Sequence, residues 1–172
     1  MRVLLVVPLL LVVAAPARAA GDAATAVAHF RNAQGQPVGE ATLRDTPHGV
    51  LIALKLDHLP PGPHGFHVHQ TGKCEPPFAT AGGHFDPQGH KHGFAAPAGP
   101  HAGDLPNVVV GADGTASLEV MVPGVTLRSG EPGSLLDADG SALVVHAGPD
   151  DYVTDPAGNS GDRIACAVVT AR

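Results

Sequence analysis

Short runs in which apolar and polar residues alternate recur along the chain from Ala24 onward. Because successive side chains of a β-strand point to opposite faces of a sheet, this two-residue period predicts strands with one buried face. Turn residues such as glycine and proline bound most of the runs. The predicted strands are Ala24–Arg31, Val38–Arg44, Gly49–Asp57, Gly65–Gln70, Asn107–Gly111, Thr115–Val122, Ser141–His146 and Arg163–Thr170.

Together these runs predict an all-β domain, because many short strands at this spacing are typical of sandwiches and barrels. The chain has 172 residues, with 22 Gly and 17 Pro, a composition that favours turns and irregular connections over long helices. The length fits one domain with one core. Asp113-Gly114 is a typical turn pair and joins the fifth and sixth predicted strands.

Two long stretches between the predicted strands have almost no strand pattern. The first runs from Thr71 to Pro106 and the second from Ala147 to Asp162. A connection as long as the first, inside a compact domain, is usually functional or disordered. We therefore expect two long functional loops on the β scaffold.

The first 19 residues have the pattern of a secretory signal peptide. A positive charge at Arg2 precedes an apolar run over residues 3–13, and a small-residue cleavage site lies at 17–19. The apolar run is too short to span a bilayer and is interrupted by Pro8, so no membrane anchor is expected. The predicted mature domain is 20–172, secreted to the periplasm or the extracellular space.

The charge of the chain limits the classes of partner that it is expected to bind. Net charge is −6 with His neutral, and cleavage after residue 19 would remove Arg2 and Arg18 and no acidic residue, leaving −8. No run of Lys or Arg occurs in the sequence, so nucleic acid is not expected as a partner.

The two cysteines, Cys74 and Cys166, are an even pair in a chain predicted to enter an oxidising compartment. They lie too far apart in the sequence for a Cys-x-x-Cys redox motif. We therefore expect a structural disulfide, which in the chain-entropy model stabilises a loop of this length by roughly 4 to 5 kcal/mol. The alternative is a pair of free, reactive thiols.

The segment Gly65–His69 combines a strand pattern with two imidazoles. His67 and His69 are two residues apart and point to one face of the strand, whereas Phe66 and Val68 point to the other. This arrangement suits a metal on one side and a core on the other. His146 ends another apolar strand, where an imidazole either is a hydrogen-bonded core residue or faces a partner or a metal.

The first long loop is rich in residues that can bind metals. Three imidazoles and one carboxylate suit tetrahedral zinc, and such a site can order a loop because binding free energy becomes folding free energy. The alternative is a solvated His-rich loop. The loop contains His84, His90, His92, His101 and Asp104, of which His84, His92, His101 and Asp104 would form the zinc site.

Six motifs now carry a family resemblance across nearly all of the predicted mature chain. They are Gly65-Phe66-His67-Val68-His69, Gly83-His84-Phe85, Lys91-His92-Gly93, His101-Ala102-Gly103-Asp104-Leu105, Leu143-Val144-Val145-His146 and Gly161-Asp162-Arg163-Ile164-Ala165-Cys166. In this order they resemble secreted bacterial copper/zinc superoxide dismutase. The resemblance implies an eight-stranded Greek-key β-barrel or sandwich, immunoglobulin-like in architecture.

The resemblance also implies two metal cofactors, copper and zinc, and superoxide as the substrate. The copper ligands would be His67, His69, His84 and His146, and the zinc ligands would be His84, His92, His101 and Asp104. His84 would bridge the metals, since an imidazole has two nitrogens and flanking dications favour loss of its remaining proton. The other five histidines match no ligand and are expected at the surface or in loops: His29, His48, His58, His64 and His90.

Two further positions transfer from the family. Asp150 resembles the carboxylate that connects a copper-ligand histidine with a zinc-ligand histidine, here His67 and His92, although Asp151 lies beside it. Arg163 resembles the arginine that guides and docks the anion beside copper; an ordinary strand-end charge is the alternative.

The implied reaction converts superoxide to oxygen and hydrogen peroxide at a copper that is alternately reduced and oxidised, with His84 carrying a proton. Two departures from the better known eukaryotic pattern leave the steering of the anion and a homodimer surface open. The second loop contains no Lys or Arg, and the segment Thr71–Gly83 is short and contains Pro76-Pro77.

Other classes explain less of the sequence. A secreted copper-binding or copper-delivery protein on the same fold is the main alternative, and it would not need Arg163 or an open copper position. A hydrolase is disfavoured because the chain has no Gly-x-Ser-x-Gly and neither cysteine resembles a nucleophile. A zinc-only module would leave His67, His69 and His146 unexplained.

Overall fold

The computed structural model describes residues 23–172, so the predicted signal peptide lies outside the described residues. In this range the elements are β1 (Thr25–Asn32), β2 (Pro37–Thr46), β3 (Gly49–Leu56), β4 (Gly62–His64), β5 (Phe66–His69), the short 3-10 helix η1 (Ala79–Ala81), β6 (Val108–Val110), β7 (Ala116–Val122), β8 (Ala142–His146), β9 (Arg163–Val168) and β10 (Thr170–Ala171). No helix within 23–172 has the length and apolarity needed to cross a membrane. The all-β prediction is confirmed.

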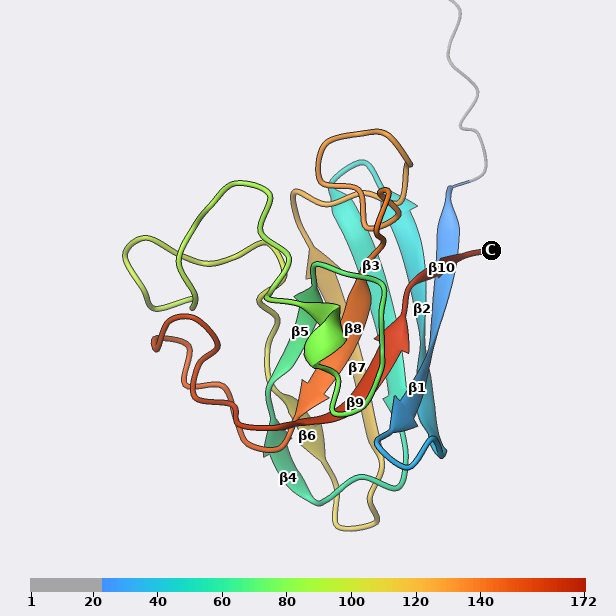
Figure 1. Ribbon diagram of the computed structural model, residues 1–172, viewed down its shortest axis with the longest axis vertical. Coiled ribbons are helices and arrows are strands. Elements are labelled where there is room, and N and C mark those ends of the chain that lie inside the picture. Colours follow the sequence, from blue (N-terminus) through green and yellow to red (C-terminus); the bar gives the residue numbers. More distant parts are fainter. Residues whose placement is uncertain (1–22) are drawn as a thin grey trace, which may run out of the picture.

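Most of the strands form one curled antiparallel sheet (Figure 1). Its order is β5-β8-β9-β1-β2-β3-β7, with β10 also paired to β1, while β4 and β6 form a separate two-stranded sheet. Strands distant in sequence are neighbours, as β9 is to β1 and β7 is to β3, and such crossovers are a feature of Greek-key connections. Because the sheet curls, a single sheet encloses the core. In a sandwich, two packed sheets would enclose it.

The predicted strands are all present, with differences at particular places. The last predicted strand is interrupted at Val169, so β9 pairs with β8 while β10 pairs with the start of β1. No alternating pattern predicts β4, which has three residues including Pro63. The turn at Asp113-Gly114 is present, yet β6 and β7 do not form a hairpin, because β6 pairs with β4 and β7 with β3.

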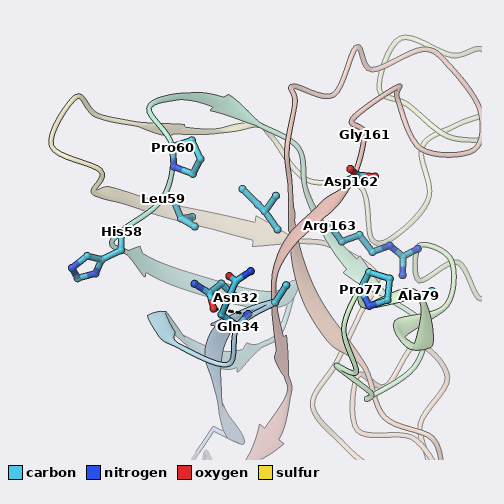
Figure 2. A pocket seen from close by; sticks show the side chains of 12 residues that line it. Asn32, Gln34, His58, Leu59, Pro60, Pro77, Ala79, Gly161, Asp162 and Arg163 are labelled. Atoms are coloured by element: carbon cyan, nitrogen blue, oxygen red, sulfur yellow. Dashed lines mark hydrogen bonds between the residues drawn. The ribbon is translucent and has the colours of Figure 1, made fainter.

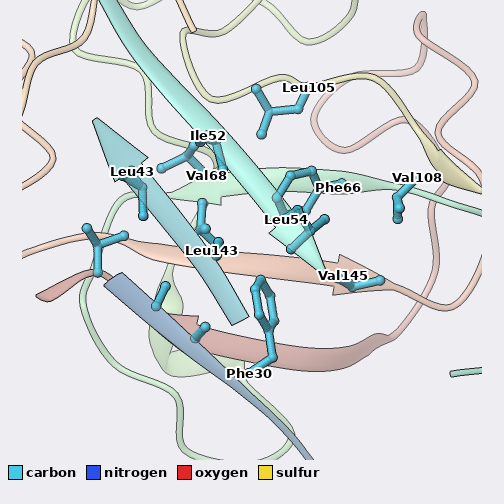
Figure 3. Packing of buried hydrophobic residues seen from close by; sticks show 14 of the residues in the cluster. Phe30, Leu43, Ile52, Leu54, Phe66, Val68, Leu105, Val108, Leu143 and Val145 are labelled. Carbon is cyan, nitrogen blue, oxygen red and sulfur yellow. The ribbon is translucent and has the colours of Figure 1, made fainter. Parts of the chain in front are cut away.

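The inward face of the curled sheet holds the core (Figure 3). Its alternating apolar residues include Phe30, Leu43, Ile52, Leu54, Phe66, Val68, Leu143 and Val145, each at most 1% exposed. Phe66 and Val68 therefore point into the core, and the strand period turns His67 and His69 to the opposite side. Burial of the apolar face thus fixes the direction of the two imidazoles.

The two predicted loops lie on the same side of the sheet, the first in green and yellow-green and the second in red in Figure 1. An ion pair between Lys91 of the first loop and Asp155 of the second joins them at 2.9 Å. A third long connection, residues 123–141, was not singled out from the sequence. The buried carboxylate of Asp45 anchors it by accepting hydrogen bonds from Leu127 N and Thr126 Oγ1.

A disulfide joins Cys74 in the first loop to Cys166 in β9, with a Cα–Cα distance of 5.6 Å. This pairing confirms the predicted structural disulfide, and the alternative of two free thiols is wrong. Phe78 and Val144 are buried around it in a small second apolar cluster. The start of the first loop is therefore fixed to the strand that begins with Arg163.

Candidate metal centre

The metal-facing side of β5 is covered by the first long loop. Phe85 N donates a hydrogen bond to Val68 O at 2.8 Å, and Val68 N donates to Gly103 O at 2.9 Å. Because these backbone bonds dock the loop on the free edge of β5, His84 and Asp104 lie opposite His69 and His67 as isolated bridge partners. Two distant parts of the sequence thereby bring their ligands to one place.

Four imidazoles converge at the first predicted site. The ligand atoms of His67, His69, His84 and His146 all lie within 4.8 Å of one another, and all four residues are buried. His146, at the end of β8, approaches His69 with an Nε2–Nε2 distance of 3.4 Å. The rings of His67 and His84 are stacked, with their centroids 3.9 Å apart.

Two ring nitrogens in this cluster show where it can bind a further group. His67 Nδ1 and His84 Nε2 are buried and have no hydrogen-bond partner among the described residues. A buried polar atom without a partner costs roughly 1 to 3 kcal/mol, unless another group binds it. A metal that accepts both lone pairs removes this cost, so the donor set fits copper, for which imidazole is a suitable ligand.

Burial also keeps these imidazoles in the form that binds metals. Loss of hydration lowers the pKa of His69 to about 2 and that of His146 to about 3. The same effect, opposed by the hydrogen bond to Asp104, lowers the pKa of His84 to about 4. The rings are therefore neutral at pH 7, with lone pairs available for a cation.

The second predicted site is centred on one carboxylate oxygen. Asp104 Oδ1 lies 2.8 Å from Nδ1 of His84, 3.0 Å from Nδ1 of His92 and 3.2 Å from Nδ1 of His101. Its other oxygen accepts hydrogen bonds from Gly93 N and His101 N, at 2.8 and 3.0 Å. Three imidazole nitrogens and one carboxylate oxygen at one point are a fitting donor set for tetrahedral zinc.

The carboxylate of Asp104 is ionised in this setting. Desolvation by itself would raise the pKa of Asp104, but hydrogen bonds from His84 and Gly93 N outweigh it and hold the pKa well below its usual value. His84 belongs to both sets, since its Nδ1 faces Asp104 and its Nε2 is one of the two copper-set nitrogens without a hydrogen-bond partner in the described part of the chain. The geometry thus brings together all seven predicted ligands, with His84 shared.

Asp150 lies between the two sets. Its Oδ2 is 2.7 Å from His67 Nε2 and its Oδ1 is 3.0 Å from His92 Nε2. Desolvation raises the pKa of Asp150, whereas the hydrogen bonds from His67 and His92 lower it, with a net result of about 2. Asp151, the neighbour that the sequence could not separate from it, is exposed and bonds within its own loop to Thr154 and Asn159.

Arg163 opens β9 beside the copper ligand His146, its partner in the β8–β9 register. Nη1 donates to Phe78 O at 2.6 Å and Nη2 donates to Gly82 O at 2.7 Å. Gly82 O also accepts a hydrogen bond from His69 Nδ1 at 2.9 Å, so one carbonyl connects the arginine to a copper ligand. Desolvation lowers the pKa of Arg163 below its usual value, but the guanidinium still carries its charge at pH 7.

The stem of Arg163 lines an open hollow of about 680 Å³ together with Pro77, Ala79 and Asp162 (Figure 2). None of the seven predicted ligands lines this hollow. The head of Arg163 extends toward the segment that contains Pro77 and Ala79. Cys74 of the same loop is joined to β9 by the disulfide.

One of the five histidines that match no ligand lies in an environment different from the predicted one. His29, His48, His58 and His90 are exposed as expected, but His64 is only 3% exposed. Its two ring nitrogens lie 2.8 Å from His146 O and 2.8 Å from Pro60 O. The expectation of a surface or loop role is therefore wrong for His64, because β4 packs its ring under the end of β8.

The sequence reasoning missed several residues around the site. Asn107 and Tyr152 contact Asp150, and the carbonyls of Phe78 and Gly82 hold Arg163. No local pattern marks them: three of these contacts join residues more than 40 positions apart, and the fourth, from Tyr152 to Asp150, spans only two residues but follows from the loop conformation. For Gly82, its position two residues before His84 is the one available signal.

Comparison with known proteins agrees with the geometry of the two ligand sets. The family model described as copper/zinc superoxide dismutase matches residues 37–169. The chain is 50% identical over 144 residues to "Superoxide dismutase [Cu-Zn] 2" of Aquifex aeolicus (strain VF5), covering 83% of this chain and 84% of that protein. The chain belongs to the copper/zinc superoxide dismutase family.

The fold of this chain is also similar to that of solved structures. A double mutant of a SOD-like protein from Bacillus subtilis has a TM-score of 0.80 at 43% identity, covering 83% of this chain and 95% of the other. Cu/Zn superoxide dismutase from Brucella abortus has a TM-score of 0.67 at 31% identity, covering 85% and 99%. In this chain, six histidines and one aspartate form the two sets.

Proposed function

We propose that this protein catalyses the dismutation of superoxide, in which two superoxide anions and two protons give oxygen and hydrogen peroxide. The observation that carries the proposal is the pair of buried donor sets that share His84. Copper would be held by His67, His69, His84 and His146, and zinc by His84, His92, His101 and Asp104. When bound, copper supplies the one-electron redox couple and zinc a structural and electrostatic partner.

Arg163 docks the substrate in this proposal. Its guanidinium is held by two carbonyl oxygens, and two bonds fix its direction while they leave other N–H donors free to face an anion. Because Gly82 O bonds both Arg163 and His69, the positive charge keeps a constant position relative to the copper ligands. Such preorganised charge lowers the cost of binding a small anion.

In this proposal His84 transfers a proton, and Asp150 orients two imidazole rings. His84 keeps Nδ1 directed at Asp104, so its Nε2 is the nitrogen that can take a proton and pass it to the departing product. Asp150 accepts a hydrogen bond from His67 and one from His92, which fixes the tautomer of both rings with the opposite nitrogen directed at a metal.

Location and assembly complete the proposal. Residues 1–19 would be removed as a signal peptide, and the mature domain 20–172 would act in the periplasm or outside the cell. The disulfide between Cys74 and Cys166 supports this, because such bonds persist in oxidising compartments. A homodimer is one candidate assembly, to be measured by sedimentation of the mature protein.

The test is metal analysis combined with superoxide consumption by the purified mature protein. We expect one copper and one zinc per chain, together with consumption of superoxide that is lost when copper is removed and regained when it is returned. A protein that binds copper fully but does not consume superoxide would instead be a copper-binding or copper-delivery protein. A protein that binds neither metal would contradict both functions.

A further inference from the structure

The side chain of Asn107 binds the peptide groups of Asp150 as a neighbouring strand would. Asn107 Oδ1 accepts a hydrogen bond from Asp150 N at 2.8 Å, and Asn107 Nδ2 donates one to Asp150 O at 2.9 Å. Asn107 lies between the first loop and β6, 43 residues before Asp150. The carboxamide thus fixes the backbone of a residue in the second loop from the end of the first.

Tyr152 closes this contact into a small network. Its hydroxyl accepts a hydrogen bond from Asn107 N at 2.8 Å, and its own N donates to Asp150 Oδ1 at 2.6 Å. The ring of Tyr152 packs on Phe94 of the first loop, with centroids 5.4 Å apart. Tyr152 has φ 62, a left-handed conformation that a non-glycine residue keeps only where its surroundings determine it.

The carboxylate of Asp150 has little room to move. Its side chain is 1% exposed and touches the Nε2 atoms of both His67 and His92. The backbone of Gly158 packs against the same place: a Cβ at Gly158 would lie 2.7 Å from His92 Nε2 and still closer to Asp150 Oδ1. A shift of Asp150 would therefore have to turn or release one of the two rings.

We propose that Asn107 is a positioning residue for both metals, which acts on His67 and His92 through Asp150, with Tyr152 as its partner. The proposal rests on the metal sites of the proposed function. Without the carboxamide, the N–H and the C=O of Asp150 lose their partners, and the carboxylate is no longer held in line with both rings. A ligand ring that can turn binds its metal less tightly, because ordering it then opposes binding.

The first test replaces Asn107 by an apolar residue of similar size. Asn107→Leu in the full mature protein should weaken zinc binding roughly 10- to 100-fold, the range found when groups that orient metal ligands are removed. Zinc affinity is measured by chelator competition, and the absorption spectrum of Co²⁺ in the zinc site should change in the same variant. Val109→Thr, on the exposed side of β6, is the matched control and should leave both unchanged.

A purely structural role predicts a different result. In that case Asn107→Leu would lower the melting temperatures of the metal-free and metal-loaded proteins equally, since zinc would bind both variants with the same affinity. A positioning role predicts that the rise in melting temperature on metal loading becomes smaller, because that rise depends on the dissociation constant. Equal losses with unchanged zinc affinity would overturn the proposal.

A second variant keeps the proposal testable if Asn107→Leu does not fold. Asn107→Asp retains an acceptor for Asp150 N but loses the donor to Asp150 O, so zinc should bind more weakly than in the wild type and more tightly than in any folded Leu variant. An Asp variant with wild-type zinc affinity and an unchanged Co²⁺ spectrum would also overturn the proposal.

A double-mutant cycle separates action through Asp150 from a direct effect. In an Asp150→Ala background, Asn107→Leu should change zinc affinity less than about twofold, because the route is already absent. The same loss in both backgrounds would contradict the proposed route. These readouts need only metal binding, so a wild-type protein that binds zinc but does not consume superoxide would overturn the proposed function and leave this test valid.

Discussion

At the scale of single residues, the ring of His84 connects the two donor sets. Nδ1 lies 2.8 Å from Asp104 Oδ1, and Nε2 is buried with no hydrogen-bond partner within residues 23–172. Since an imidazole has only these two ring nitrogens, both are used in the shared arrangement. Removal of this ring should therefore affect both metals, whereas removal of any other single ligand acts directly on one.

The first prediction concerns this ring. His84→Ala should lower zinc content and alter the copper spectrum of the loaded protein, because each site loses one of its four donors. His90→Ala, an exposed histidine of the same loop, is the control and should change neither. Metal analysis and electron paramagnetic resonance measure the two effects. Full zinc retention with a normal copper spectrum would exclude the bridging role.

The second prediction concerns Arg163. Arg163→Glu should lower the second-order rate with superoxide at least about tenfold, about 1.4 kcal/mol of barrier, because it replaces the proposed docking cation with an anion. Arg44→Glu on β2 carries the same charge change at an exposed position and is the control. Pulse radiolysis gives the rate, and a variant with both metals and its full rate would remove Arg163 from the site.

At the scale of elements, the site combines ligands on β5 and β8 with ligands from the first loop, and several bonds hold that loop in place of core contacts. The first loop is held by the disulfide to β9, by backbone bonds to β5 and by Lys91–Asp155. The disulfide has a particular consequence. Cys74 and Phe78 lie in the same short segment, and Phe78 O holds Arg163, so the bond also supports the arginine.

The third prediction follows from this connection. Reduction should lower the melting temperature, and in the chain-entropy model the loss of stability is roughly 4 to 5 kcal/mol. The reduced protein should also lose part of its rate, because the carbonyl that holds Arg163 becomes more mobile. A Cys74→Ser/Cys166→Ser protein is the control and should not respond to reductant. Two free thiols in the unreduced protein, found by mass spectrometry, would reject the connection.

At the scale of the whole molecule, the negative net charge repels the anionic substrate. The predicted mature chain carries −8 with His neutral, and the second loop, residues 147–162, has no Lys or Arg. Attraction of superoxide must therefore come from a local positive charge near the copper set rather than from the net charge. Such a local field acts over a distance that salt controls.

The fourth prediction is a salt dependence. The second-order rate should fall as ionic strength rises, because the screening length shrinks to about 10 Å at 0.1 M and the reach of Arg163 shrinks with it. The Arg163→Glu protein, in which the local charge is reversed, should show a flat or rising dependence. A wild-type rate that increases with salt would mean that repulsion by the acidic surface dominates.

The fifth prediction is a pH dependence of the metal-free fold. Folding lowers the pKa of His69, His84 and His146 to about 2, 4 and 3, whereas in the unfolded chain each titrates near 6.5. Below pH 6.5 the unfolded state therefore binds more protons, so the free energy of unfolding is largest above that pH and decreases as pH falls. Between pH 7.5 and 5 we expect a loss of at least about 2 kcal/mol by urea denaturation.

The chosen pH window separates the histidines from the carboxylates in the same experiment. The pKa values of Asp104 and Asp150 also lie below their usual value, so their contribution is lost only as pH falls below about 4. The window from pH 7.5 to 5 thus reports on the histidines. Metal-free protein whose free energy of unfolding stays constant across this window would contradict the burial of neutral imidazoles.

The sequence by itself determined most of the strands and the kinds of ligand. A two-residue period is a local property, so it predicts by itself that Phe66 and Val68 point into the core and that His67 and His69 point to the other face. The same is true of the donor chemistry of the first loop and of the even pair of cysteines. These features need only the neighbours of a residue in the sequence.

Only the tertiary structure decided which distant groups meet. Asn107 contacts Asp150 across 43 residues, His64 packs against the carbonyl of His146, and β6 pairs with β4 rather than with β7. Short strands such as β4 and β10 form because neighbouring strands offer them backbone partners. The physical reason is that a hydrogen bond between distant residues depends on the packing of whole elements, and no period or composition near either residue encodes that packing.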